Sequence, residues 1–211
     1  MSSSLTLAQS SNKLLLTALG YDLWRRRSIS LMTGEDFPLE REFRQFLDWV
    51  GPVSGRNWLD VGTSTGNYAR VLVQEGATVT ALDLSEVFLK HLPRHPRLHR
   101  KCGIMEETLF QPVSFDGVVI AGTLNETSSW QDMLTQSARA LRENGLLYLM
   151  YLMPAQTFAG KGLQSFLGAG GIKFLAADTV RKYLQLQDFA LVQENHRGIV
   201  GFELYIKKSG M

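Results

Sequence analysis

The sequence has few of the features that mark a secreted, membrane-spanning or disulfide-stabilised protein. Its 211 residues include one cysteine, Cys102, which excludes an internal disulfide and any metal site built on several cysteines. No apolar run reaches the roughly 20 residues of a membrane-spanning helix. The longest early run, Leu14–Leu19, follows a serine-rich start without the basic region of a secretory signal. We therefore expect a cytoplasmic protein with no transmembrane segment.

Charge of one sign does not dominate the chain either. The formal net charge is +2, so composition does not indicate a nucleic-acid partner. Basic residues gather locally in Arg25–Arg27 and in His91–Lys101, where solvated loops are the more economical interpretation. Three histidines at a spacing of four fall in the second stretch, but Pro93 and Pro96 prevent them from sharing a helical face. We therefore expect no metal site.

The chain has no internal repeat, and 45% hydrophobic residues suffice for one globular domain. Residues 1–37 are predicted to be a helical cap segment, with an amphipathic helix over Leu5–Arg27, and residues 38–211 a single domain. A helix starts at Pro38 and ends before Gly51. Its half-buried face is formed by Phe43, Phe46, Leu47 and Val50.

Strands and helices alternate from residue 57 onward. We predict strands at 58–61, 78–84, 98–102, 115–121 and 146–152, and helices at 67–75, 86–92 and 129–142. This alternation is typical of a doubly wound α/β fold with a parallel sheet.

The last part of the chain has a different pattern. Residues 154–177 are glycine-rich and are predicted to be irregular, and a helix over 178–187 follows. Two strands at 189–195 and 199–207, joined by a tight turn at 196–198, form a hairpin. The prediction is a Rossmann-like, seven-stranded sheet that is mostly parallel, with an antiparallel last strand.

A glycine-bearing turn and two acids indicate the ligand. Asp60 ends the first strand of the alternation, and Gly62 and Gly66 shape the turn into the next helix, where they let a ligand approach the backbone. Asp83 ends the following strand. A carboxylate there can accept two hydrogen bonds from a ribose diol. The spacing therefore favours an adenosine-type ligand.

These motifs resemble the class I S-adenosylmethionine-dependent methyltransferases, in particular the group related to ubiquinone and menaquinone biosynthesis. The segments that carry the resemblance are Trp58–Ala69, Asp83, Phe115–Ala121, Leu141–Leu147 and the closing hairpin. The resemblance implies a methyltransferase that binds S-adenosyl-L-methionine, releases S-adenosyl-L-homocysteine and methylates a small, hydrophobic or quinone-like molecule. The cofactor-binding residues that it implies are Asp60, Gly62, Thr63, Gly66, Asp83, Leu84, Ile104, Met105 and Ala121.

The sequence departs from the family pattern at two places in the cofactor site. Ser64 stands where the family usually has its middle glycine, and Ile104 where it often has an aspartate for the adenine amino group. Adenine would then be held by backbone groups and by the apolar walls of Ile104 and Met105. The segment after the fourth strand, 122–126, lacks a common aromatic or histidine pair, which predicts an unusual acceptor pocket.

Three residues are candidates for a general base or another direct catalytic role at the pocket rim: Glu126, His196 and Tyr21. Glu126 could instead cap the next helix, and His196 could be a solvated turn residue. The N-terminal corner offers an aromatic shield for a sulfonium in Tyr21 or Trp24, and Arg25 could pair with the cofactor carboxylate. A packing helix with a solvated basic end is the other interpretation of that corner.

Other functions stay open. A nicotinamide dehydrogenase is disfavoured, because the glycine spacing is not G-x-G-x-x-G and the terminal hairpin does not fit. A non-catalytic S-adenosylmethionine-binding protein and an RNA or protein methyltransferase remain alternatives. No specific nucleic-acid partner is expected, peripheral membrane contact is left open, and both a monomer and a homodimer are compatible with the sequence.

Overall fold

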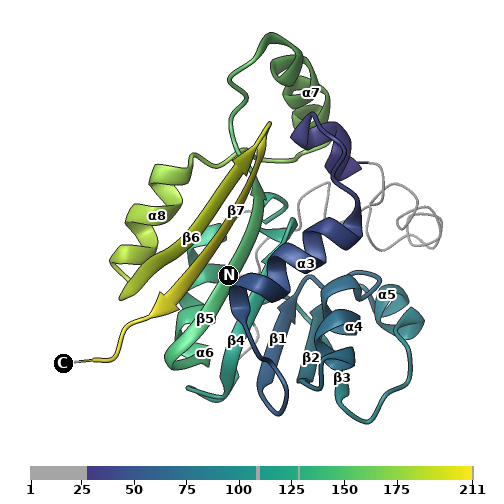
Figure 1. The fold of residues 1–211 in the computed structure, drawn as a ribbon, viewed down its shortest axis with the longest axis vertical. Coiled ribbons are helices and arrows are strands. Elements are labelled where there is room, and N and C mark those ends of the chain that lie inside the picture. Colours follow the sequence, from purple (N-terminus) through teal and green to yellow (C-terminus); the bar gives the residue numbers. More distant parts are fainter. Residues whose placement is uncertain (1–27, 108–109, 128, 211) are drawn as a thin grey trace.

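A computed structural model describes residues 28–107, 110–127 and 129–210 of the chain. One seven-stranded sheet forms its centre, in the order β3-β2-β1-β4-β5-β7-β6, and helices cover both faces (Figure 1). The strands are β1 (Asn57–Val61), β2 (Thr78–Asp83), β3 (Leu98–Cys102), β4 (Phe115–Ala121), β5 (Leu141–Leu152), β6 (Phe189–Arg197) and β7 (Val200–Lys207). The helices are α3 (Leu39–Val50), α4 (Asn67–Gln74), α5 (Glu86–His91), the short η1 (Thr123–Asn125), α6 (Trp130–Ala140), α7 (Phe158–Ala169) and α8 (Ala177–Gln185).

The sheet confirms the predicted fold class. Strands β1 to β5 are mutually parallel, and β7 is antiparallel to both of its neighbours, β5 and β6. The last strand therefore lies inside the sheet, between β5 and β6. The order of the strands along the sheet reverses at β1, which has β2 on one side and β4 on the other. The carboxyl ends of these three parallel strands therefore border one common opening.

Successive side chains of a strand point to opposite faces of the sheet, and the buried ones form one apolar layer on each face. Tyr148, Met150 and Leu152 of β5 pack in one cluster with α3 and α4, whereas Leu147, Leu149 and Tyr151 pack on the opposite face with α6 and α8. Both clusters consist of buried side chains, which explains why the central strands read as nearly continuous apolar runs.

The hairpin of β6 and β7 contacts the first described helical residues. Its turn lies at Gly198 and Ile199 and begins two positions later than the predicted 196–198 turn, because β6 continues to Arg197. The Ile199 amide donates to the Met32 carbonyl at 3.0 Å, and the Met153 amide donates to the Ile199 carbonyl at 2.7 Å. The tip of the hairpin therefore fixes the helical segment 28–33 to the end of β5.

Two predictions about local structure are wrong. The glycine-rich stretch 154–177 contains the helix α7, which begins where the Thr157 hydroxyl accepts a hydrogen bond from the Gly160 amide at 3.1 Å. Leu163 and Leu167 of this helix pack against the apolar core and offset the low helix propensity of its glycines. In Figure 1, α7 lies beside the helical segment 28–33 at one end of the molecule.

The second difference concerns the start of β5, which begins at Leu141 and not at residue 146. Leu141 pairs with Phe115, and the next pair is Leu146 with Gly117, so residues 142–145 form an irregularity within the strand. Asn144 has a φ of 59° there. Gly145 therefore belongs to a bulge in the strand and does not end the preceding helix, which stops at Ala140.

The predicted Leu5–Arg27 helix lies outside the described residues. Residues 28–37 pack against the domain, because Ile29 and Phe37 are fully buried in its core. Across the part of the chain that the structure describes, we find no helix long and apolar enough to cross a membrane.

Candidate functional site

A cavity opens at the carboxyl ends of β1, β2 and β4. Its empty space, counted together with the open mouth, is about 1110 Å³. Its lining combines polar groups at the ends of the strands with apolar side chains from segment 28–33, the end of β5 and α7. The acidic lining residues are Asp83, Glu106 and Glu126, and the apolar ones include Met32, Met105, Met133, Met150, Leu167 and Ile172.

The turn after β1 is locked by backbone hydrogen bonds to β2. The amides of Gly62 and Thr63 both donate to the Leu82 carbonyl, at 2.8 and 3.0 Å. Gly62 has a φ of 68°, and a Cβ at this position would lie 1.8 Å from the Thr123 hydroxyl oxygen. Glycine is therefore required here both by the backbone conformation and by the close approach of the segment after β4.

Asp83 ends β2 inside the cavity, and its carboxylate is oriented by two backbone donors. The Ser64 amide donates to Oδ2 and the Ser85 amide to Oδ1, each at 2.8 Å. Burial raises the pKa of Asp83, and the hydrogen bonds from Ser85 and Ser64 oppose that rise. Each carboxylate oxygen has two acceptor positions, so both retain one for a ligand in the cavity.

Asp60 has a different position from Asp83. Its Oδ2 accepts hydrogen bonds from the Thr63 hydroxyl at 2.6 Å and from the Ala69 amide at 3.1 Å, and the residue does not line the cavity. Burial raises the pKa of Asp60 to about 7, against the opposing hydrogen bonds from Thr63 and Ala69. The carboxyl group therefore ties the glycine turn to the first turn of α4.

Ser64 occupies the middle of this turn in a left-handed conformation, with a φ of 50°. Its side chain lines the cavity, and its hydroxyl oxygen is buried without a hydrogen-bond partner among the described residues. Gly66 also has a positive φ, 83°, but a Cβ there would meet Leu92 at 2.3 Å and not the cavity. Ser64 is therefore the residue of the turn with a polar group available to a ligand.

The segment after β3 forms the side of the cavity next to Asp83. Its first amide, that of Gly103, donates to the Asp83 carbonyl at 2.9 Å. Ile104 and Met105 supply apolar lining, and Glu106 supplies a carboxylate that accepts a hydrogen bond from the Thr127 hydroxyl. Sequence reasoning had not identified Glu106, although a carboxylate two residues after the altered position 104 was a signal that could have pointed to it.

The structure brings many of the predicted site residues together around the cavity and leaves others out. Those that line it are Gly62, Asp83, Leu84, Ile104, Met105, Ala121 and Glu126. Asp60, Thr63 and Gly66 lie in or beneath the turn and are not part of the lining. Tyr21, Trp24 and Arg25 lie outside the described residues.

His196 lies on β6 and does not line the cavity. Its Nε2 is 3.2 Å from Oε1 of Glu203, a fully buried carboxylate that also accepts a hydrogen bond from the Tyr205 hydroxyl at 2.6 Å. Glu194 lies close enough to His196 and Glu203 that the three side chains have the spacing of metal ligands. However, the Arg181 guanidinium pairs with Glu194 and lies 3.8 Å from Glu203, so this side chain already supplies the positive charge.

Comparisons with known proteins agree with this geometry. Residues 59–149 match the model of a family described as a methyltransferase domain. A ubiquinone biosynthesis O-methyltransferase of Paracidovorax citrulli is 28% identical over 127 residues, which cover 52% of this chain and 53% of that protein. A demethylmenaquinone methyltransferase of Tropheryma whipplei is 30% identical over 108 residues, covering 46% and 42%. The chain thus spans about half the length of these curated relatives.

Solved structures share the fold over more of the chain. An S-adenosylmethionine-dependent methyltransferase from Mesorhizobium loti superimposes with a TM-score of 0.68 at 16% identity, covering 81% of this chain and 99% of the other. A Haemonchus contortus N-methyltransferase in complex with S-adenosylhomocysteine has a TM-score of 0.74 at 12% identity, covering 94% and 60%. At these identities the likeness concerns the fold alone.

Proposed function

We propose that the chain is a class I, S-adenosylmethionine-dependent methyltransferase, which transfers a methyl group from S-adenosyl-L-methionine to a small molecule; the match of residues 59–149 to a methyltransferase domain supports this proposal. The observation that carries this proposal is the Asp83 carboxylate, held by two backbone amides at the end of β2 beside the glycine turn. This is the position at which a doubly wound sheet binds the ribose of a nucleotide-like ligand.

The residues around the cavity fit such a cofactor. Each Asp83 oxygen has an acceptor position left for one hydroxyl of the ribose diol. The buried Ser64 hydroxyl has no partner among the described residues and can bind a polar group of the cofactor beside Gly62. Ile104 and Met105 offer apolar surface to the adenine ring, and Leu84 and Ala121 complete the proposed cofactor contacts. Asp60, Thr63 and Gly66 would act indirectly, by holding the turn.

When bound, the cofactor supplies an electrophilic methyl group on a sulfonium, and the protein supplies alignment. An in-line displacement requires the acceptor atom to lie opposite the sulfur, and fixed orientation of this kind is worth ~7–11 kcal/mol. The walls that would align the acceptor are Met32 of segment 28–33, Met150 of β5, and Leu167 and Ile172 in and after α7. They also exclude water from the reacting atoms.

An apolar acceptor, quinone-like or otherwise hydrophobic, suits these walls. The relatives named for ubiquinone and menaquinone chemistry support this substrate class at about 30% identity. Glu126 is the proposed general base if the acceptor must lose a proton, since it lines the cavity directly after η1. His196 is the weaker candidate because it faces Glu203, outside the cavity lining. We further propose that residues 1–37 form a cap over the site, with Tyr21 and Arg25 contacting the cofactor.

Calorimetry with S-adenosylmethionine and S-adenosylhomocysteine tests the proposal. We expect micromolar binding of both ligands by the unaltered protein and a loss of at least about tenfold in affinity for Asp83→Ala. Asp132→Ala, which changes an exposed acid on α6, is the matched control and should bind like the unaltered protein. Absence of binding by the folded, unaltered protein would contradict the proposal. Binding without turnover across a panel of acceptors would instead favour the non-catalytic alternative.

A further inference from the structure

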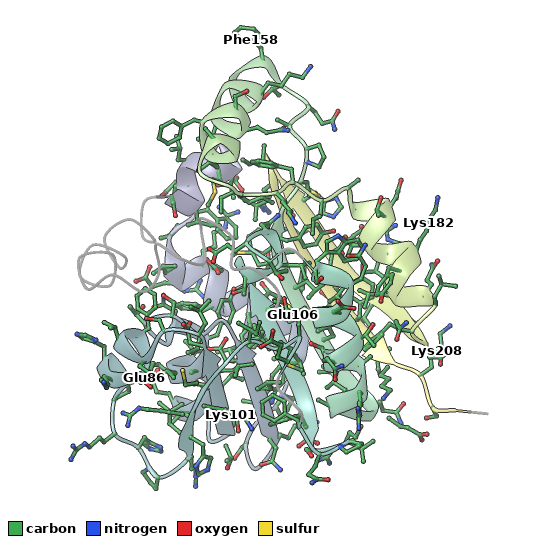
Figure 2. All side chains as sticks on the ribbon, turned by 180° about the vertical axis from the view of Figure 1, so that it is seen from behind. Glu86, Lys101, Glu106, Phe158, Lys182 and Lys208 are labelled. Carbon is green, nitrogen blue, oxygen red and sulfur yellow. The ribbon has the colours of Figure 1, made fainter. Side chains whose placement is uncertain are left out.

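The two carboxylate oxygens of Glu106 differ in their hydrogen bonding. Its Oε1 accepts a hydrogen bond from the Thr127 hydroxyl. Its Oε2 is buried and has no hydrogen-bond partner among the described residues, although the side chain lines the cavity. Figure 2 shows Glu106 near the middle of the molecule, far from the tip marked by Phe158. A buried acceptor without a donor is costly, so the donor is expected from a ligand in the cavity.

Thr127 determines how this carboxylate is oriented. The Thr127 side chain is buried, with 1% of its surface exposed, and its hydroxyl oxygen accepts a hydrogen bond from the Ser129 amide at 3.1 Å. The single hydroxyl hydrogen is then directed at Oε1 of Glu106. Thr127 is therefore a positioning residue that leaves Oε2 as the free acceptor.

The position of Glu106 identifies the donor, provided that the proposed function holds. Asp83 takes the ribose, and the segment that leads to Glu106 starts at Gly103, whose amide donates to the Asp83 carbonyl at 2.9 Å. This segment lies on the side of Asp83 that faces away from β1, because β3 pairs with β2 on its outer edge. With the ribose on Asp83, the base is the part of the cofactor that would fit this side, because Ile104 and Met105 offer apolar surface to a planar ring and not to the charged amino-acid end. The Ile104 side chain has no acceptor to offer it.

We propose that Oε2 of Glu106 accepts a hydrogen bond from the exocyclic amine of adenine and thereby selects a 6-amino purine. A 6-oxo purine carries an acceptor oxygen at the same place, and two acceptors facing each other in a buried site repel. Glutamine at position 106 should reverse the preference between the 6-amino and the 6-oxo purine. Its amide oxygen can still accept from Thr127, and its amide nitrogen can donate to a 6-oxo group.

The experiment compares S-adenosylhomocysteine with S-inosylhomocysteine, which differs by the 6-oxo group, using calorimetric affinities. We expect the unaltered protein to prefer the adenosyl compound by at least about tenfold. Glu106→Gln should weaken adenosyl binding by about tenfold and strengthen inosyl binding. Glu107→Gln is the matched control, since Glu107 is exposed and does not line the cavity. Thermal unfolding of each variant checks that it folds like the parent.

The outcomes separate this inference from the proposed function. If the unaltered protein binds S-adenosylhomocysteine but does not discriminate against the inosyl compound, the assignment of Glu106 is overturned and the function stands. The same conclusion follows if Glu106→Gln and Glu107→Gln have equal affinities for both ligands. If the unaltered, folded protein binds neither compound, the proposed function fails, and the assignment fails with it.

Discussion

The Ser64 amide donates to Oδ2 of Asp83 across 2.8 Å, and it can do so because Ser64 has a left-handed φ of 50°. The strained residue of the turn after β1 therefore orients the acid at the end of β2. Two segments that are about twenty residues apart in sequence are joined into one binding surface by this contact.

Ser64→Gly should preserve the fold, because glycine adopts a positive φ without a Cβ penalty. Binding of S-adenosylhomocysteine should weaken only by the loss of the hydrogen bond proposed for the Ser64 hydroxyl. The buried hydroxyl has no partner among the described residues whose loss would cost stability. We expect the free energy of unfolding to change by no more than about 1 kcal/mol. Ser64→Val should lower it by at least that amount and weaken ligand binding, since a β-branched residue resists this conformation. Equal stabilities of the two variants in chemical unfolding would contradict the assigned strain.

Gly62→Ala should be much more harmful than the same change at another glycine of positive φ. A Cβ at residue 62 would overlap Thr123, whereas at Gly55, with a φ of 74°, nothing lies within 4 Å. We expect Gly62→Ala to cost about 3 kcal/mol or more and Gly55→Ala about 1 kcal/mol in free energy of unfolding. Urea titrations measure both. Similar losses at the two positions would mean that conformation alone, and not the contact with Thr123, requires glycine at residue 62.

Ligand binding should weaken as the pH falls, because Asp83 must be ionised to accept two ribose hydrogen bonds. Burial raises the pKa of Asp83 above its ordinary value, so this carboxylate becomes protonated at a higher pH than an exposed carboxylate does. Affinity for S-adenosylhomocysteine should be constant above that raised pKa and decrease below it. Calorimetry between about pH 8 and about pH 5 measures the profile. Asp83→Asn should bind weakly with a flatter profile, and an unchanged slope in this variant would assign the titration to another group.

The stability of the protein should decrease as the pH rises through the range in which Asp60 ionises. Its pKa is about 7 in the folded protein and 3.8 when unperturbed. Between these values the folded state holds a proton that the unfolded state has released, so stability is highest at the acidic end and the loss is complete above about pH 7. A shift of this size corresponds to a few kcal/mol, on the order of 1.4 per pKa unit.

Asp60→Asn isolates this effect, because its amide oxygen can still accept hydrogen bonds from Thr63 and Ala69. Relative to the parent, the variant should gain stability between about pH 4 and about pH 7. Asp83 also has a raised pKa but is present in both proteins, so its contribution cancels in the comparison. If the free energies of unfolding of parent and variant instead change with pH in parallel over this range, Asp60 does not cause the pH dependence of stability.

Much of the fold could be predicted from local pattern. The strand over Leu98–Cys102 was predicted with its actual bounds although four of its five residues are exposed, because the alternation of strands and helices required a strand there. The antiparallel β7 followed from the closing hairpin. Both predictions depended on the order of strands and helices, which can be read from the sequence pattern.

The failures have a common physical cause, which is tertiary contact. The glycines of α7 argued against a helix, and only its packing through Leu163 and Leu167 against the core overrides that preference. At the site, spacing identified both acids but could not distinguish their directions. Asp60 points into the turn and Asp83 into the cavity, a difference set by the donors around each. Glu106 depended on Thr127, which is distant in sequence and therefore invisible to local reasoning.

The tip of the hairpin limits how this protein can be engineered. Hairpin turns are ordinarily good places for inserted peptides, labels or new chain ends. Here a Cβ at Gly198 would lie 2.3 Å from the Met32 carbonyl oxygen, and Met32 lines the cavity. A longer or bulkier turn would therefore displace one wall of the cavity from more than 160 residues away in sequence. The exposed segment between α5 and β3, residues 93–97, is the better point of attachment for a fluorophore or an affinity tag.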